Sequence, residues 1–156
     1  MSQIIGSVEV AYNRKEKIWQ AQNGQVIASH PPGKEGKKAA IIAAVSYENP
    51  VLASLADAAA TRWPELSSRI WKAAINVVNG RLLPSQNQYV GEVARFESLA
   101  TDDIWVLQWF PHTGPCCSCP DHEEAKAPIG PQGHRYCNHA LTYLLQNKLQ
   151  EASRVP

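Results

Sequence analysis

The sequence predicts an α+β protein: an N-terminal β-hairpin or three-stranded sheet plus helices, followed by a β-hairpin, a Cys/His loop and a closing helix. Three observations predict this class. Apolar and polar residues alternate near the N-terminus, apolar residues recur at helical spacing through the middle, and all four cysteines lie between Cys116 and Cys137. The chain has 156 residues, of which 44% are hydrophobic and 19% charged, so it is globular and long enough to bury a core.

The first elements have the order β-β-β-α. Residues 7–12 alternate in polarity, as in a half-buried strand. The dipeptide Asn23-Gly24 then joins two further strands, and it suits a two-residue type I′ hairpin turn because both residues tolerate positive φ. The Pro-Pro-Gly sequence of residues 31–33 ends the third strand. The alanine content of residues 34–45 predicts a helix.

Two more helices and a candidate boundary follow. Asn49 is suited to cap a helix with Pro50 at its first position, and apolar residues at i, i+3, i+4 and i+7 carry that helix to near Trp63. Pro64 opens an amphipathic helix that ends at Gly80. The Pro, Ser and Asn content beyond it is typical of a linker. The predicted division is a binding region over residues 1–80, a linker over 81–88 and a finger-like unit over 89–150.

The C-terminal unit contains two predicted strands, Tyr89–Phe96 and Ile104–Phe110. The second strand, IWVLQWF, is apolar on both faces, so we expect it to be buried on both sides or to face a partner. A Cys-rich loop follows, and a short helix over Ala140–Leu149 closes the unit.

The cysteines and one histidine form two closely spaced pairs, Cys117-x-Cys119 and Cys137-x-His139. Each pair can place two ligands on one side of a metal ion. Three thiolates and one imidazole are a preferred tetrahedral set for structural zinc. We therefore expect one structural Zn²⁺ and no catalytic residue, because a filled coordination shell leaves no open position for water.

Other interpretations of these residues remain open. Disulfides would require an oxidising compartment. A cysteine nucleophile could use His112 or His139 as its base. Cys116, His122 and His134 lie close enough in sequence to contribute a metal ligand in place of a predicted one. We expect Cys116 and the additional histidines to be bystanders.

The order of these motifs resembles that of the SWIM zinc finger: a β-hairpin, C-x-C-P-D, and then C-x-H at the head of an apolar helix. The resemblance covers roughly residues 89–150 and implies the same four ligands, Cys117, Cys119, Cys137 and His139. The neighbouring Cys116 and a long acidic spacer depart from the minimal family pattern. The family occurs in transposases, remodelling helicases and some kinases, where its role is taken to be DNA or protein binding. The resemblance therefore implies a binding module and no reaction.

A second candidate site lies at one end of the predicted N-terminal sheet. The β-β-β-α order brings the first turn and the start of the first helix to the same end, where basic residues exceed acidic ones. An anion bound there would meet free backbone N–H groups at the helix start. The arrangement distantly resembles the arm-type DNA-binding domains of phage integrases. The alternative is an ordinary solvated edge. The candidate nucleic-acid-binding residues are Arg14, Lys15, Lys17, Lys34, Lys37 and Lys38.

The formal net charge of +1 argues against coating nucleic acid by bulk charge, so any polyanion site must be local. The longest apolar run, residues 39–45, is far short of the roughly 18 residues of a membrane span. We expect an intracellular (cytoplasmic), non-enzymatic zinc-finger protein that binds nucleic acid, DNA before RNA, from a mobile element or phage. The alternative is a protein-interaction adaptor with a structural zinc. Neither interpretation includes a membrane or a small-molecule substrate.

Overall fold

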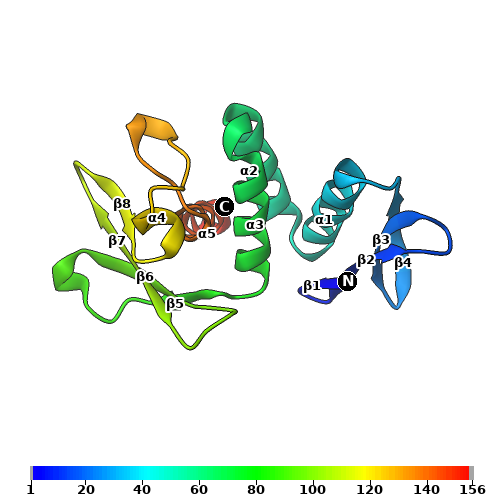
Figure 1. The fold of residues 1–156 in the computed structure, drawn as a ribbon, viewed down its shortest axis with the longest axis horizontal. Coiled ribbons are helices and arrows are strands. Elements are labelled where there is room, and N and C mark those ends of the chain that lie inside the picture. Colours follow the sequence, from blue (N-terminus) through cyan, green and yellow to red (C-terminus); the bar gives the residue numbers. More distant parts are fainter. Residues whose placement is uncertain (1, 155–156) are drawn as a thin grey trace.

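The computed structural model describes residues 2–154, which form two four-stranded antiparallel sheets with helices between them (Figure 1). The N-terminal elements are β1 (Ser2–Ile5), β2 (Val8–Asn13), β3 (Ile18–Asn23), β4 (Gln25–His30) and α1 (Lys34–Glu48). The helical middle contains α2 (Pro50–Arg62), η1 (Pro64–Leu66) and α3 (Ser67–Val78). The C-terminal elements are β5 (Leu82–Pro84), η2 (Gln88–Val90), β6 (Glu92–Glu97), β7 (Ile104–Phe110), β8 (Gly114–Cys117), α4 (Pro120–Glu123), η3 (Pro131–Gly133) and α5 (Asn138–Arg154). The predicted α+β class is confirmed.

The first sheet has the strand order β1-β2-β3-β4. Three of these strands were predicted from the sequence. The additional strand is β1, which precedes them in the chain and pairs with β2. The β3–β4 turn also differs from the expected type I′ turn. Only Gly24 has positive φ there, Asn23 stays in β3, and a bulge between Ala21 and Gln22 adjusts the register. Gly24 alone therefore provides the left-handed backbone that reverses the chain.

One face of this sheet packs against α1. Val8, Val10 and Ala21 lie on that face and are buried, as are Ala40 and Ala44 of the helix. Small alanine side chains let the helix approach the sheet closely, which explains the composition that predicted it.

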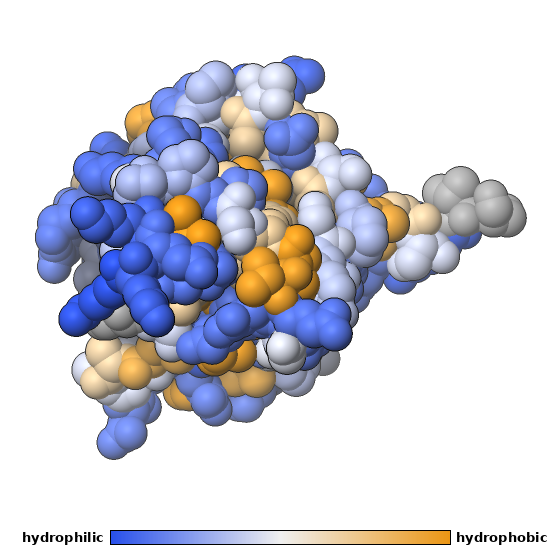
Figure 2. Space-filling view, turned by 90° about the vertical axis from the view of Figure 1, so that its right-hand side faces the viewer, coloured by the Kyte–Doolittle hydropathy of each residue, from blue (hydrophilic) through white to orange (hydrophobic). Residues whose placement is uncertain are grey.

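The other face of the sheet is exposed to solvent and carries polar residues such as Glu9, Gln20 and Gln22. Figure 2, seen from the side of β1–β4, shows a mostly hydrophilic surface with separate hydrophobic areas. The exposed apolar residues of β1 and β4 are Ile4 and Val26. The sheet is therefore covered by helix on one side only.

The helices in the middle begin as predicted. The Oδ1 atom of Asn49 accepts a hydrogen bond from the backbone N–H of Leu52 at 3.0 Å, and Pro50 occupies the first position of α2. Pro64 opens a short 3₁₀ turn before α3 starts at Ser67. Helix α3 then packs against both α2 and α5, so it lies at the centre of the molecule (Figure 1).

The second sheet has the order β5-β6-β7-β8. The predicted hairpin is present as β6 and β7, and strands flank it on both sides. Its first strand starts at Glu92 rather than at the predicted Tyr89, because residues 88–90 form a 3₁₀ turn. Strand β5 lies within the expected linker of residues 81–88 and pairs with β6, whereas β8 lies in the expected Cys-rich loop and pairs with β7. The domain division at residues 81–88 stays a prediction. None of the helices within residues 2–154 is long and apolar enough to cross a bilayer.

Candidate metal centre and basic surface

The structure brings the four predicted metal ligands together from three segments. Cys117 is the last residue of β8, and Cys119 immediately precedes α4. Cys137 precedes α5, and His139 lies in the first turn of that helix. Because side chains alternate along a strand, β8 turns Cys117 inward while its neighbour Cys116 is exposed to solvent.

The ligand atoms of these four residues all lie within 4.8 Å of one another. The Sγ of Cys117 is 3.6 Å from the Nδ1 of His139. All three thiols are at most 2% exposed. This is the one Cys, His, Asp or Glu group within residues 2–154 with such a geometry, and it is positioned to bind one metal ion.

The proximity of the three thiols perturbs their acidity. Hydrogen bonds from Cys117 and Cys137 lower the pKa of Cys119, because they stabilise its thiolate. The pKa of Cys117 is raised by its hydrogen bonds to Cys119 and Cys137 and by burial. Cys117 and Cys137 therefore keep their protons more readily than an isolated cysteine would. A divalent cation would replace those protons, so metal binding should release protons.

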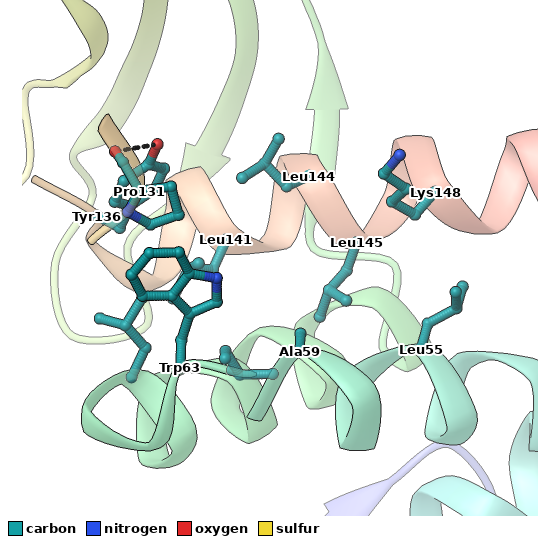
Figure 3. Close-up of a pocket in the computed structure, with 11 residues that line it drawn as sticks. Leu55, Ala59, Trp63, Pro131, Tyr136, Leu141, Leu144, Leu145 and Lys148 are labelled. Carbon is teal, nitrogen blue, oxygen red and sulfur yellow. Dashed lines mark hydrogen bonds between the residues drawn. The ribbon is translucent and has the colours of Figure 1, made fainter. Parts of the chain in front are cut away.

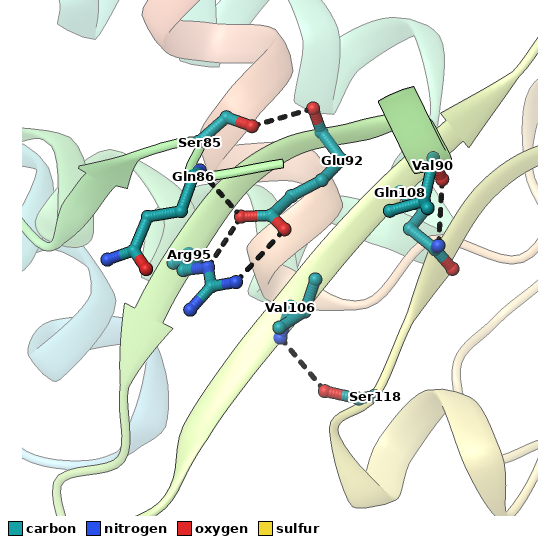
Figure 4. A network of polar contacts seen from close by, with 8 residues as sticks. All are labelled: Ser85, Gln86, Val90, Glu92, Arg95, Val106, Gln108 and Ser118. Carbon is teal, nitrogen blue, oxygen red and sulfur yellow. Dashed lines mark hydrogen bonds and ion pairs between the residues drawn. The ribbon is translucent and has the colours of Figure 1, made fainter. Parts of the chain in front are cut away.

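Contacts around the cluster hold the ligands in place. Ser118, between two of the cysteines, accepts a hydrogen bond from the N–H of Val106 through its Oγ at 2.9 Å (Figure 4). Its own N–H donates to the carbonyl of Val106 at 3.1 Å. The ring of Phe96 lies 4.6 Å from that of His139, centroid to centroid. Strands β6 and β7 therefore position the loop and the imidazole.

A buried carboxylate supports the same sheet. The Glu92 side chain is 2% exposed, pairs with Arg95 and accepts the backbone N–H of Gln86 at 2.9 Å (Figure 4). The hydrogen bond from Arg95, followed by that from Gln86, holds the pKa of Glu92 below its ordinary value. Because Gln86 leads from β5 into β6, this network joins the edge strand to the sheet. No sequence pattern had indicated it.

The remaining candidate ligands lie outside the cluster. Cys116 and His112 are exposed, and the Nδ1 of His122 is buried without a hydrogen-bond partner. The His134 ring packs over Gly114, where a Cβ atom would lie 2.6 Å from its Cδ2. Gly114, with a φ of +70°, is therefore needed both for its backbone conformation and for this close approach.

The predicted basic end of the first sheet is also formed. The pairing of Tyr12 with Trp19 and of Trp19 with His30 places the β2–β3 turn at the same end as the start of α1. The structure gathers only part of the predicted set into one hollow. Arg14, Lys15 and Lys17 are exposed and lie outside the two hollows at this end of the sheet.

The other predicted lysines, Lys34, Lys37 and Lys38, line a hollow of about 460 Å³ between α1 and α3. Lys72 of α3 lines the same hollow, and the Nζ of Lys38 donates to the Oγ of Ser67 at 3.2 Å. We call this the basic hollow. No pattern in the sequence indicates Lys72, because only the packing of α3 against α1 brings it near the other lysines.

Two acidic residues of the spacer are paired. Asp121 forms an ion pair with Arg69 of α3, and Glu124 pairs with Lys126. The ion pair between Arg69 and Asp121 joins the segment that follows Cys119 to helix α3. Part of the acidic charge of the spacer is therefore neutralised within the chain.

The strand IWVLQWF is buried in part. Leu107 is fully buried, whereas Ile104 and Phe110 at its ends are exposed. Trp109 packs against Tyr143 and Tyr136, with ring centroids 5.8 and 6.3 Å apart.

Comparison of the chain with protein-family models, with curated proteins and with solved structures gives no significant match.

Proposed function

We propose that the Cys/His cluster holds one structural zinc ion. In a tetrahedral zinc site, a sulfur at about 2.3 Å and a nitrogen at about 2.05 Å from the ion lie about 3.6 Å apart. The distance between Cys117 Sγ and His139 Nδ1 is 3.6 Å. The Cys₃His donor set also favours zinc over magnesium or calcium, which prefer oxygen ligands. Four protein ligands leave no open position, which supports a structural role without a reaction.

We further propose that residues 89–150 form a SWIM-like finger. The order of a hairpin (β6–β7), a loop with two cysteines and a helix that begins beside the C-x-H pair supports this proposal. Strand β8 and the ion pair between Asp121 and Arg69 are additions to the expected pattern.

The function that the geometry supports best is non-enzymatic binding of nucleic acid, foremost DNA, at the basic end of the first sheet. One observation carries it: Lys34, Lys37, Lys38 and Lys72 surround one hollow, where Glu35 is the single acidic lining residue. Such a local cluster attracts phosphate although the net charge of the chain is only +1. A bound zinc with three thiolates has a formal charge of −1 (2 − 3), so the finger offers no comparable attraction.

The test compares two triple variants with the same change in charge. Lys34, Lys37 and Lys38 are replaced by Gln in one, and Arg62, Lys126 and Arg154, which lie elsewhere on the surface, in the other. Binding of labelled oligonucleotides is measured by fluorescence polarisation at several salt concentrations. The Lys34/Lys37/Lys38 variant should bind more weakly. The slope of its log affinity against log salt concentration should fall by an amount that corresponds to the loss of up to about three phosphate contacts. Equal affinities and slopes for both variants would reject the basic end as the binding site.

The adaptor function remains the second candidate, because the structure contains an apolar groove. Helices α2, α3 and α5 line a hollow of about 320 Å³ (Figure 3). Trp63 and Leu145 face it, and Lys148 lies at its edge. This groove fits an apolar segment of a partner protein with an acidic residue opposite Lys148. Absence of oligonucleotide binding even at low salt would favour this function.

A further inference from the structure

We propose that the nucleic acid bound by this protein is single-stranded and follows a track of three adjacent hollows. The proposal rests on the proposed nucleic-acid function and adds the strandedness of the ligand and its path. The basic hollow shares Lys34 and Lys37 with a second hollow of about 360 Å³, the aromatic hollow, which is also lined by Tyr12 and Trp19. The basic hollow also shares Lys72 with a third hollow, of about 560 Å³. The three hollows therefore lie next to one another beside α1 and α3.

The aromatic hollow offers a surface on which a base can stack. Tyr12 and Trp19 are directly opposite each other on β2 and β3, with ring centroids 5.3 Å apart. Both are only partly buried, because α1 begins beside them and leaves this end of the sheet face open. The Nζ of Lys37 lies 5.4 Å from the centroid of the Trp19 ring. An aromatic ring beside a cation is the combination that binds a base and its phosphate in single strands.

The basic hollow supplies the phosphate contacts in the middle of the track. Lys34, Lys37 and Lys38 come from one wall and Lys72 from the other. The hydrogen bond from Lys38 to Ser67 directs that ammonium group across the hollow toward α3. A flexible chain lying between α1 and α3 could therefore contact cations on both sides.

The third hollow, which we call the amide hollow, ends the track. Its lining includes Arg81 and the carboxamides of Gln3 and Asn138, and it has no acidic lining residue. Carboxamides can donate to and accept from the edges of unpaired bases. The neighbouring Asn79 is already bonded to Gly6 and Ile4, so it holds β1 against α3.

This sequence of hollows favours a single strand over a duplex. The bases of a duplex are stacked on each other, so they cannot stack on Trp19 or reach the amide hollow without being unpaired. A single strand exposes both its bases and its phosphates. DNA and RNA share this chemistry, so the test includes both.

The experiment uses the full-length, zinc-loaded protein with three labelled probes: oligo-dT and oligo-U of about 12 nucleotides, and a DNA duplex of the same length. We expect tighter binding of the single strands. Trp19→Ala should reduce single-strand affinity by roughly 5- to 150-fold, the range for one stacked base, while Trp19→Phe keeps most of it. Duplex binding and the salt dependence should change little, because phosphate contacts remain. Lys72→Gln should flatten the single-strand salt slope by about 0.7.

If Trp19→Ala lowers the melting temperature, Tyr12→Leu tests the same surface without emptying the space beside α1. Equal affinity for duplex and single strand, together with no effect of either aromatic variant, would overturn the single-strand path. The nucleic-acid function would survive that result if the Lys34/Lys37/Lys38 variant still weakened binding. Failure of all three probes to bind at low salt would overturn both proposals. Tighter binding of oligo-dT or oligo-U than of the duplex supports the path, and the tighter of the two shows which of these polymers the surface prefers.

Discussion

The two sheets have the same number of strands and the same antiparallel order, but they are held together differently. Sheet β1–β4 buries Ile5, Val8 and Val10 beneath α1, an aliphatic core that needs no ligand. Sheet β5–β8 buries Phe96 and Leu107, and three buried thiols and an imidazole gather beside its edge strand β8. We expect the second sheet to gain stability from an ion bound by these ligands, whereas the first sheet, which is covered by α1, contributes no such ligand group among residues 2–154.

The two ends also differ in charge. The basic hollow beside the first sheet gathers four lysines, whereas the acidic loop next to the metal centre is partly neutralised by Arg69 and Lys126. One end of the molecule is therefore suited to folding around a metal, and the other to contact with a polyanion. The following predictions test this separation.

Loss of the metal should have the largest effect and should be confined to the second sheet. Structural zinc contributes about 10–16 kcal/mol in zinc-finger peptides. Cys137→Ser should abolish zinc binding, measured by metal analysis. In hydrogen exchange, the amides of Arg95 and Val106 should lose protection, while those of Val10 and Ala21 keep theirs. Equal loss of protection in both sheets, or an unchanged melting curve, would contradict the separation.

A matched pair of core substitutions should distinguish the two sheets. Phe96→Ala should cost about 3–5 kcal/mol and Ile5→Ala about 2–5 kcal/mol in the free energy of unfolding, because both side chains are buried. Only Phe96 contacts the His139 ring, so only its replacement should also weaken zinc binding in a chelator competition. Weaker zinc binding in Ile5→Ala would show that the two sheets are coupled.

The Glu92–Arg95 pair should make the second sheet sensitive to acid. The pKa of Glu92 lies below its ordinary value of 4.5, so the folded state binds fewer protons there than the unfolded state. The stability from this pair is present above pH 4.5 and is lost as the pH falls through the folded pKa. Glu92→Gln should lower the melting temperature at pH 7, and its difference from wild type should shrink in acid. A difference independent of pH would exclude this role for the carboxylate.

Replacement of Cys116 should have the smallest effect. Its side chain is exposed and lies outside the ligand cluster, so Cys116→Ser should keep its full zinc content and melting temperature. The control is Cys117→Ser, which should lose the metal. The ligand assignment would be wrong by one residue if Cys116→Ser lost zinc and Cys117→Ser retained it.

Features that depend on neighbours along the chain could be predicted from the sequence. Asn49 and Pro50 start α2, the apolar pattern of IWVLQWF defines β7, and the two closely spaced Cys/His pairs can meet at one ion. Capping, side-chain periodicity and ligand spacing act over a few residues, so a local pattern is enough to predict them.

Only the tertiary structure decided which distant elements meet. Strands β1, β5 and β8 are short, and each exists because it pairs with a neighbouring strand rather than through its own propensity. Lys72 joins the lysines of α1 because α3 packs beside that helix, and Glu92 is buried because β5 folds back onto β6. Such contacts depend on the free energy of packing between segments that are far apart in the sequence, and no local pattern contains that information.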